Sequence, residues 1–394
     1  MMGIKIQDSM KKLTYVLNHY SEEEASHFVH VLYLIERMAG KGCKITLLIE
    51  KADKLPVFEN DNVKVMRPFT KLPLLRHLEM FVRIIFLILS GYKRTFVRIA
   101  APAAIVASLA HRICGGRSYL WQSGTAYEHD MAQPRSIKKL RWWLVSYLPN
   151  TLARKLTHRF VTGPESMVDY YVDVVGVPRN KIDLLYNDVQ IDRFDRVLHP
   201  EDRRDFCSKN RVSEDALILL LVHRLSPVRR TLMYLEPFLK RVAADLSGTE
   251  WVLVVVGGGS ELQSAKGMVS TLGMEQHVVF LGDVPNLEVP GLYAVGDIFV
   301  HPTYTEGFPR VLIEAMAAGL PIVSTDAGGT FQLFGARQKC YIVDKRDPDG
   351  FAEKAIDLIL NKGAWAELSE ENRNVVQRFS TEAVSDMYIR VLFS

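Results

Sequence analysis

Short apolar runs alternate with segments of helical periodicity in two separate parts of the chain. The first alternation begins with residues 13–18 (LTYVLN), continues with apolar residues at helical spacing through 28–38, and ends with the apolar run 45–49. Apolar runs of this length, separated by amphipathic helices, are typical of parallel strands joined by crossover helices. The first part of the chain is therefore predicted to open with a strand–helix–strand unit.

The alternation starts again after residue 215. Its first run, residues 217–222 (LILLLV), suits a parallel strand that is buried on both faces. Two separate alternations predict an α/β protein of two Rossmann-like, doubly wound domains that face each other across a cleft. In this second part we expect helices near 234–246, 261–272 and 310–318, and strands at 251–256, 278–281, 298–301 and 322–324.

The boundary between the two domains is predicted where charged residues are dense and apolar residues are few, between 190 and 215. We assign residues 1–195 to an N-terminal domain and residues 196–378 to a C-terminal domain. A last helix, near 379–394, is expected to pack back onto the N-terminal domain. A chain of 394 residues that is 48% hydrophobic and 24% charged has enough apolar material for two such cores.

The cysteines and the apolar segments bear on the compartment. The four cysteines are far apart and form no CxxC pair, which favours isolated thiols in a reducing compartment over disulfides or a zinc site. The first twelve residues lack the pattern of a signal peptide. The uninterrupted apolar run 84–92 is too short to cross a bilayer, which needs about 20 residues. A cytoplasmic protein that is not integral to the membrane is expected.

Charge is distributed unequally. Residues 1–195 carry 28 Lys and Arg against 19 Asp and Glu, a net charge of +9, whereas the remainder has a net charge of −5. Residues 64–159 contain 17 basic and three acidic residues. This asymmetry indicates an anionic partner for the first half of the chain.

Two glutamates, Glu306 and Glu314, flank the start of the helix predicted near 310–318. A helix N-terminus offers free backbone N–H groups and partial positive charge, and so suits a phosphate group. A carboxylate on each side could accept hydrogen bonds from sugar or ribose hydroxyls. The alternative is structural: Glu314 could be a surface residue paired with Arg310, and Glu306 could cap the helix.

Arginines and glycines follow two of the predicted strands. Arg224 and Arg229 come directly after the run 217–222, at the end of a parallel strand where ligands bind. Two guanidinium groups there could clamp a diphosphate, or could belong to a solvated basic loop. The glycines 257–259 follow the strand 251–256, where they could admit a ligand close to the backbone or simply form a tight turn.

Residues 254–329, from VVVGGGSELQ to EGFPRVLIEAMAAGLPIVSTDAGG, resemble the C-terminal domain of glycosyltransferase family 4. Members of that family are retaining enzymes of the GT-B fold. The resemblance covers most of 216–345, with weaker similarity at 13–49 and at 186–194 (YNDVQIDRF). It implies transfer of a sugar from a UDP- or GDP-linked donor with retention of configuration, the donor phosphate accepting the acceptor's proton. It implies no metal and no separate cofactor.

The resemblance also implies residue roles. Glu306 would hold hydroxyls of the transferred sugar, and Glu314 those of the ribose. Arg224 and Arg229 match the family's Arg and Lys on the diphosphate. Gln122 stands near the place of the family's N-domain His, with His27 and His129 as other candidates. The further positions implied for donor binding are Phe308, Pro309, Arg310, Val311, Gly258, Asp283 and Val284.

The sequence departs from the family at other positions as well. Ala25 and Ser26 replace the glycine pair before the first helix, His223 replaces a glycine, and Gln332 replaces a glutamate. Since these positions lie around the donor, the resemblance leaves the identity of the transferred sugar open.

The basic segments 72–95 and 137–159 mix Lys and Arg with large apolar residues. This composition suits the interface of an anionic bilayer, although a core helix with a solvated basic face would have the same composition. In GT-B enzymes that act on lipid-linked acceptors, the N-terminal domain lies on the membrane. We therefore expect a peripheral enzyme on the cytoplasmic face, acting on a lipid-linked or cell-surface saccharide.

Three other functions stay open on sequence grounds. One is a nucleotide-sugar epimerase of the same fold, which would need no membrane acceptor. Another is a non-catalytic partner that binds nucleotide sugars, suggested by the missing family His. Nucleic-acid binding ranks low, because the basic segments are interleaved with long aliphatic runs.

Overall fold

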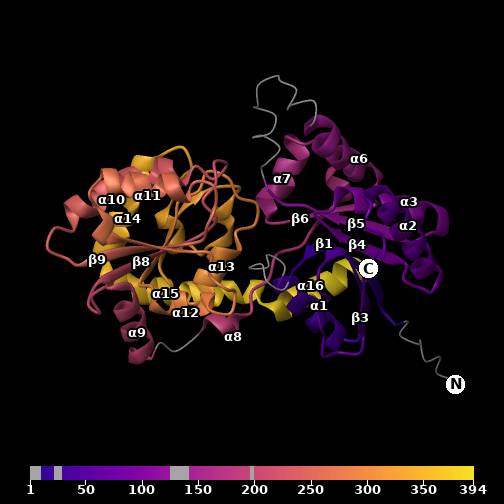
Figure 1. Cartoon of the computed structure of the whole chain (residues 1–394), viewed down its shortest axis with the longest axis horizontal. Helices are drawn as coiled ribbons and strands as arrows, with labels where there is room; N and C mark the ends of the chain where they lie inside the picture. Colours follow the sequence, from indigo (N-terminus) through magenta and orange to yellow (C-terminus); the bar gives the residue numbers. More distant parts are fainter. Residues whose placement is uncertain (1–9, 22–28, 125–141, 196–198) are drawn as a thin grey trace.

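The computed structural model describes residues 10–21, 29–124, 142–195 and 199–394. Figure 1 shows two lobes, each built around a twisted sheet with helices on both faces. All strand pairs in both sheets are parallel. The predicted fold of two Rossmann-like domains is confirmed.

The N-terminal sheet has seven strands in the order β3-β2-β1-β4-β5-β6-β7. The strands are β1 (Lys12–Tyr20), β2 (Lys44–Ala52), β3 (Val63–Met66), β4 (Arg94–Arg98), β5 (Arg117–Trp121), β6 (Arg159–Thr162) and β7 (Ile182–Leu184). The helices are α1 (Val29–Gly40), α2 (Pro73–Leu89), α3 (Ala101–Cys114), α6 (Leu148–Leu156) and α7 (Glu165–Asp173), with a π-helical turn at Trp143–Tyr147 before α6.

The C-terminal sheet has six strands in the order β10-β9-β8-β11-β12-β13. The strands are β8 (Leu217–Val222), β9 (Trp251–Val256), β10 (Val278–Gly282), β11 (Ile298–His301), β12 (Ile322–Asp326) and β13 (Ile342–Asp344). The helices that follow β7 along the chain are α8 (Ile191–Phe194), α9 (Pro200–Asn210), α10 (Thr231–Asp245), α11 (Leu262–Thr271), α12 (Val289–Val295), α13 (Arg310–Ala317), α14 (Pro348–Leu360), α15 (Trp365–Val375) and α16 (Thr381–Phe393).

The apolar run of β8 is buried on both faces, as its composition predicts. Leu219 and Leu221 pack with α10 and α14 in one cluster, whereas Ile218 and Leu220 pack with α12 and α13 in another. Neighbouring residues of a strand point to opposite faces, so a continuous apolar run supplies both cores.

The last helix, α16, belongs to the N-terminal lobe. Its Val384, Tyr388 and Leu392 are fully buried in one cluster with α1, β1 and β2, and Figure 1 shows it beside α1. The chain therefore crosses between the lobes twice. The two crossings lie side by side, because the backbone N–H of Val189 donates to the carbonyl of Phe379 and that of Thr381 donates to the carbonyl of Val189.

Helices α2, α3 and α6 form a layer on the other face of the N-terminal sheet, with α3 between the other two. Each of the outer helices buries one side and exposes apolar residues on the other. None of the described helices is both long and apolar enough to cross a bilayer.

Candidate donor-binding site

The candidate site lies where the connections of the C-terminal sheet change direction. β8 lies between β9 and β11. The chain runs from β8 to β9 and β10 on one side, and then crosses to β11 and continues to β12 on the other. The loops after β8 and β11 therefore leave the sheet in opposite directions and open a crevice between them, which is where doubly wound sheets bind ligands. Arg224 and Arg229 follow β8, and Glu306 follows β11.

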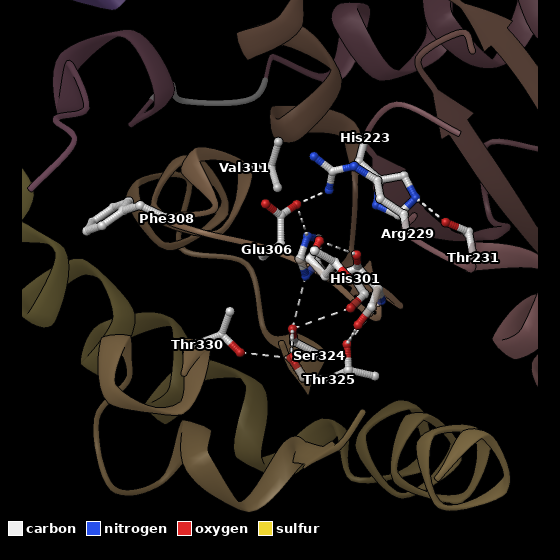
Figure 2. Close-up of polar contacts among 12 residues, drawn as sticks. His223, Arg229, Thr231, His301, Glu306, Phe308, Val311, Ser324, Thr325 and Thr330 are labelled. Atoms are coloured by element: carbon white, nitrogen blue, oxygen red, sulfur yellow. Dashed lines mark hydrogen bonds and ion pairs between the residues drawn. The ribbon is translucent and has the colours of Figure 1, made fainter. Parts of the chain in front are cut away.

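Glu306 and Arg229 form an ion pair across this crevice (Figure 2). The Glu306 side chain is 11% exposed and that of Arg229 is 24% exposed. Burial, and then the neighbouring Arg224 charge, lower the pKa of Arg229 to about 10, so the guanidinium stays charged at neutral pH. Arg224 is exposed and has no carboxylate partner within the described part of the chain. Glu306 does not cap the helix α13, because no described side chain bonds to the first N–H groups of that helix.

Glu314 lies on the first turns of α13 and is 6% exposed. It forms an ion pair with Arg310 Nη2 at 3.2 Å and accepts a hydrogen bond from Tyr293 Oη at 3.1 Å. The pairing with Arg310 that the sequence allowed is present, but the burial excludes a surface role for Glu314. A buried carboxylate with oxygen lone pairs to spare beside a crevice suits ligand hydroxyls.

The start of α13 has no side-chain cap. Pro309 is the residue before the helix, and no side chain among the described residues bonds to its first N–H groups. Phe308 is buried, and Val311 lies beside Glu306 in Figure 2. Uncapped N–H groups, including that of Val311, are available to an anionic ligand between the two glutamates.

The three glycines after β9 are explained by close packing against the chain's own loops. A Cβ atom at Gly258 would lie 2.5 Å from the carboxylate of Asp283, which accepts a hydrogen bond from the Gly258 N–H at 2.8 Å. Gly259 has a φ of +131° and lies against the carbonyl of Leu225. Val284 packs in the cluster around α12. Asp283 and the glycines therefore join the ends of β8, β9 and β10 into one surface.

Gln122 is less clearly part of the site. It follows β5 in the N-terminal domain, where its Nε2 donates to Asn150 Oδ1 at 2.6 Å and its Oε1 accepts from Arg154 Nη1 at 3.4 Å. The next residues do reach the donor side, since a Cβ at Gly307 would lie 2.5 Å from the Gly124 nitrogen. The structure thus places the loop after Gln122, and not its amide, against the Glu306 loop. The other candidates, His27 and His129, and the pair Ala25–Ser26, lie outside the described residues.

Contacts between the domains involve residues that the sequence reasoning did not connect. The Ser166 N–H, at the start of α7, donates to Gln332 Oε1 at 2.8 Å, and Ser166 Oγ donates to the Gly328 carbonyl at 2.7 Å. Asn187 Nδ2 donates to the Phe308 carbonyl at 3.3 Å. Gln332 therefore touches the opposite domain. Since its partner is 166 positions away, no local signal in the sequence could have shown this contact.

Two histidines lie beneath the ion pair. His301 ends β11 and is completely buried, and His223 follows β8 with its Nε2 2.8 Å from Thr231 Oγ1. Burial lowers the pKa of His301 to about 3 and that of His223 well below its usual value, so both rings are neutral. The sequence reasoning noted His223 as a departure and did not consider His301. Its position at the end of a buried strand, five residues before Glu306, was the available signal.

Within the described residues, no group of three or more His, Cys, Asp or Glu side chains could hold a metal ion. The crevice offers two arginines, the half-buried carboxylate of Glu306, the buried one of Glu314 and a helix N-terminus. Such a set suits a ligand with both phosphates and hydroxyls.

Known proteins have the same organisation. Residues 202–375 match the family "Glycosyl transferases group 1". The matched region contains the whole crevice described above.

Two curated relatives are similar in sequence. The N-acetyl-alpha-D-glucosaminyl L-malate synthase of Bacillus anthracis is 25% identical over 75% of this chain and 73% of its own length. The GDP-mannose-dependent alpha-(1-6)-phosphatidylinositol monomannoside mannosyltransferase of Mycobacterium tuberculosis is 28% identical over 47% of this chain and 48% of its own length. The chain thus spans about three quarters of the first relative and half of the second, and about a third of the D-inositol 3-phosphate glycosyltransferase of Corynebacterium jeikeium.

Solved structures extend the similarity to both domains. The Anabaena protein Alr3699/HepE, in complex with UDP-glucose, superposes with a TM-score of 0.74 and 18% sequence identity over 97% of this chain and 99% of that one. At this identity the likeness establishes the fold, which is the GT-B arrangement of two Rossmann-like domains.

Proposed function

We propose that this protein is a retaining glycosyltransferase that moves a sugar from a UDP- or GDP-linked donor to a lipid-linked saccharide acceptor at an anionic membrane surface. The observation that carries the proposal is the half-buried pairing of Glu306 with Arg229 in the crevice beside the uncapped start of α13. The match of residues 202–375 to group 1 glycosyl transferases supports the same reaction class.

The donor is proposed to bind with its diphosphate between Arg224, Arg229 and the N-terminus of α13. Arginine binds phosphate oxygens bidentately, and the helix dipole favours the same negative charge. As the sugar–phosphate bond breaks, these groups stabilise the charge that develops on the leaving diphosphate. Retention of configuration follows if the acceptor hydroxyl attacks from the leaving-group side and gives its proton to a donor phosphate oxygen.

The two carboxylates are proposed to fix the ends of the donor. Glu306 lies nearest to Arg229 and would accept hydrogen bonds from hydroxyls of the transferred sugar. Glu314, held by Tyr293 and Arg310, would accept those from the ribose. In the ligand-free site, the ion pair of Glu306 with Arg229 holds both side chains at the crevice.

The acceptor is proposed to be lipid-linked because the N-terminal domain has an extensive apolar surface. We call the exposed side of α2, α3 and the Trp143–Leu156 segment the apolar face. The relatives' names include both a small-molecule and a lipid acceptor, and this face favours the lipid. Its residues, which are 40–86% exposed, are Leu74, Leu75, Leu78, Val82, Phe86, Leu89, Leu109, Ile113, Trp143, Leu144, Val145, Leu148 and Leu152.

Basic side chains surround the apolar face. Lys71 precedes α2, Lys93 follows it, Arg112 ends α3 and Lys155 ends α6, and all four are exposed. Apolar side chains with a basic rim suit an anionic bilayer, since the first enter the acyl boundary and the second meet the lipid phosphates.

The decisive experiment measures binding and turnover separately. UDP, GDP and ADP are titrated first by thermal shift, and a saturating ligand should stabilise the protein by roughly 2.7 kcal/mol at 100 times its dissociation constant. Sugar conjugates of the nucleoside diphosphate that binds are then supplied with a bacterial lipid extract. Transfer of label into the lipid phase supports the proposal.

Other outcomes identify the alternatives. Binding with conversion of one nucleotide sugar into another, without acceptor, indicates an epimerase. Binding without turnover indicates a non-catalytic partner. Absence of binding by all three nucleotides contradicts the donor site itself.

A further inference from the structure

His301 lies directly beneath Glu306, and its ring nitrogen Nε2 has no hydrogen-bond partner among the described residues. Its Nε2 is 3.8 Å from Glu306 Oε1, is completely buried, and makes no hydrogen bond within the described residues. Figure 2 shows the ring between Glu306 on one side and Ser324 on the other. A buried polar nitrogen without a partner costs about 1–3 kcal/mol, so its position beside the reacting centre needs an explanation.

The surroundings of the ring select one tautomer. His301 is neutral and so carries a single N–H. Its Nδ1 is 3.1 Å from Ser324 Oγ, whose hydroxyl also lies within reach of the carbonyls of Thr325 at 3.1 Å and His301 at 3.4 Å and can donate to the ring nitrogen in their place. The Nε2 faces a carboxylate, which accepts hydrogen bonds and repels a lone pair. The proton therefore belongs on Nε2, pointing at Glu306.

The ring is also firmly held. It stacks on Phe299 with an interplanar angle of 16° and meets His223 edge to face at 5.8 Å. Ser324, on the neighbouring strand β12, fixes its Nδ1 side. A shift of the Glu306 carboxylate by roughly 1 Å would bring it within the ordinary hydrogen-bonding range of 2.7–3.2 Å.

In the ligand-free site, Arg229 is the partner of Glu306. A bound diphosphate offers Arg229 additional negative oxygens, so the guanidinium is drawn from the carboxylate toward the phosphates. The ion pair between Glu306 and Arg229 is then weakened. The Glu306 carboxylate must nevertheless keep its orientation toward the sugar hydroxyls. The His301 Nε2–H, 3.8 Å away at the end of β11, is close enough to take over that partnership.

We propose that His301 is a positioning residue that donates from Nε2–H to Glu306 when the donor diphosphate engages Arg229, and so orients Glu306 on the transferred sugar. This inference rests on the proposed function, in which Glu306 contacts the sugar and Arg229 the diphosphate. It adds to that site a neutral donor that cannot compete for the phosphate charge.

Two amide substitutions separate this role from simple packing. In His301→Gln the side-chain amide reaches the place of Nε2, whereas in His301→Asn it reaches only the place of Nδ1, beside Ser324. We expect His301→Gln to keep kcat within about fivefold of the wild type and His301→Asn to lose roughly 10–100-fold, which is the range for one oriented hydrogen bond to a charged group. Because His301 donates to Glu306 when the diphosphate draws Arg229 away, binding of the nucleoside diphosphate should weaken in His301→Asn and stay near the wild-type affinity in His301→Gln.

A second measurement does not depend on activity. Proton–nitrogen NMR of protein labelled with ¹⁵N-histidine, with His301 assigned from the signal missing in His301→Gln, reports the tautomer of the ligand-free protein. The expected spectrum is a neutral ring with its proton on Nε2 between pH 6 and 9. A proton on Nδ1 overturns the inference, as does equal activity of the Asn and Gln variants.

The two proposals fail in distinguishable ways. If no nucleoside diphosphate binds the wild type, the donor site is wrong whatever the tautomer. If binding and transfer occur but the ring carries its proton on Nδ1, the glycosyltransferase proposal stands and the role of His301 is wrong.

Discussion

The edges formed by the carboxyl ends of the strands differ between the two sheets in how their charged groups are arranged. In the C-terminal domain, Arg229 and Glu306 lie on neighbouring loops and pair with each other beside a crevice. In the N-terminal domain, the carboxylate at the end of β2, Glu50, is buried with Arg76 Nε 4.0 Å and His77 Nε2 3.6 Å away and makes no tight contact. The C-terminal edge is therefore the one that the proposed function assigns to a small charged ligand.

The N-terminal domain differs again on its outer surface. Its helices α2 and α6 expose many large apolar side chains, whereas α10 and α14 of the C-terminal domain bury most of theirs in the core and expose Met233 and Leu360. Large exposed apolar patches on soluble proteins often mark interaction sites. Under the proposed function, the C-terminal domain would recognise a soluble donor by charge and the N-terminal domain a lipid acceptor by apolar area.

The largest expected effect is on the charged side of this comparison. Glu306→Ala should lower kcat at least 10²–10³-fold, because it removes the contact to the sugar and leaves Arg229 without its carboxylate. Glu367→Ala is the matched control, since this exposed glutamate pairs with the exposed Arg337 on the surface. Turnover is measured with the nucleotide sugar selected above. Equal activity of the two variants would show that the site lies elsewhere.

The second prediction separates the stabilities of the two domains. Leu392→Ala on α16 should lower the free energy of unfolding of the N-terminal domain by about 3 kcal/mol, because it leaves a cavity in the cluster with α1 and β1. Calorimetry should show the loss in one transition, with nucleoside diphosphate affinity preserved. Loss of nucleotide binding at a temperature where the protein is folded would contradict this division.

The third prediction concerns the apolar face. The double variant Val82→Glu, Phe86→Glu should weaken binding to vesicles of anionic lipid by roughly 10–100-fold, since each side chain contributes about 1.5–3 kcal/mol when fully buried and less at an interface. Leu287→Glu, at a residue 79% exposed in the C-terminal domain, is the control. Binding should also weaken as salt rises. Vesicle binding that is indifferent to the double substitution would place the membrane contact elsewhere.

The smallest effect on sugar transfer is expected from Glu50, whose contribution is to stability. Burial raises the pKa of its carboxyl to about 7, and Arg76 and Lys51 only partly oppose this. Between its ordinary value of 4.5 and about 7, the folded protein binds a proton that the unfolded chain does not, so stability falls as pH rises through this window. A pKa raised from 4.5 to about 7 corresponds to a loss of at most roughly 3 kcal/mol over the whole window. Glu50→Gln should flatten the denaturation profile from pH 5 to 7, and an unchanged slope would contradict the assignment.

The C-terminal domain could be predicted well from sequence because its signals are local. The run 217–222 identified a strand buried on both faces, and Pro309 and Gly319 marked the ends of the helix α13. Ligands bind at the carboxyl ends of parallel strands, so Arg224 and Arg229 were expected there, and the family resemblance assigned Glu306 to the same donor. The direct ion pair of Arg229 with Glu306 was not expected, because side-chain pairing depends on the path of each loop.

The N-terminal domain was less predictable, since periodicity does not show which side of a helix meets a sheet and which meets solvent. In α2, Met80 and Ile84 are buried while Val82 and Phe86 are exposed, and both sets are apolar. On sequence grounds, either a core helix or an interfacial helix was expected. A helix with one buried apolar side and one exposed apolar side was not anticipated.

The sequence by itself determined the two strand–helix alternations, the charge asymmetry, and the loops that carry the arginines and glutamates. Only the tertiary structure decided that Glu314 is buried, that Gln332 touches Ser166 of the opposite domain, and that His301 lies beneath Glu306. The physical reason is the range of the interactions. Strand, helix and turn preferences act over a few residues, whereas burial and pairing follow from contacts between segments that folding alone brings together.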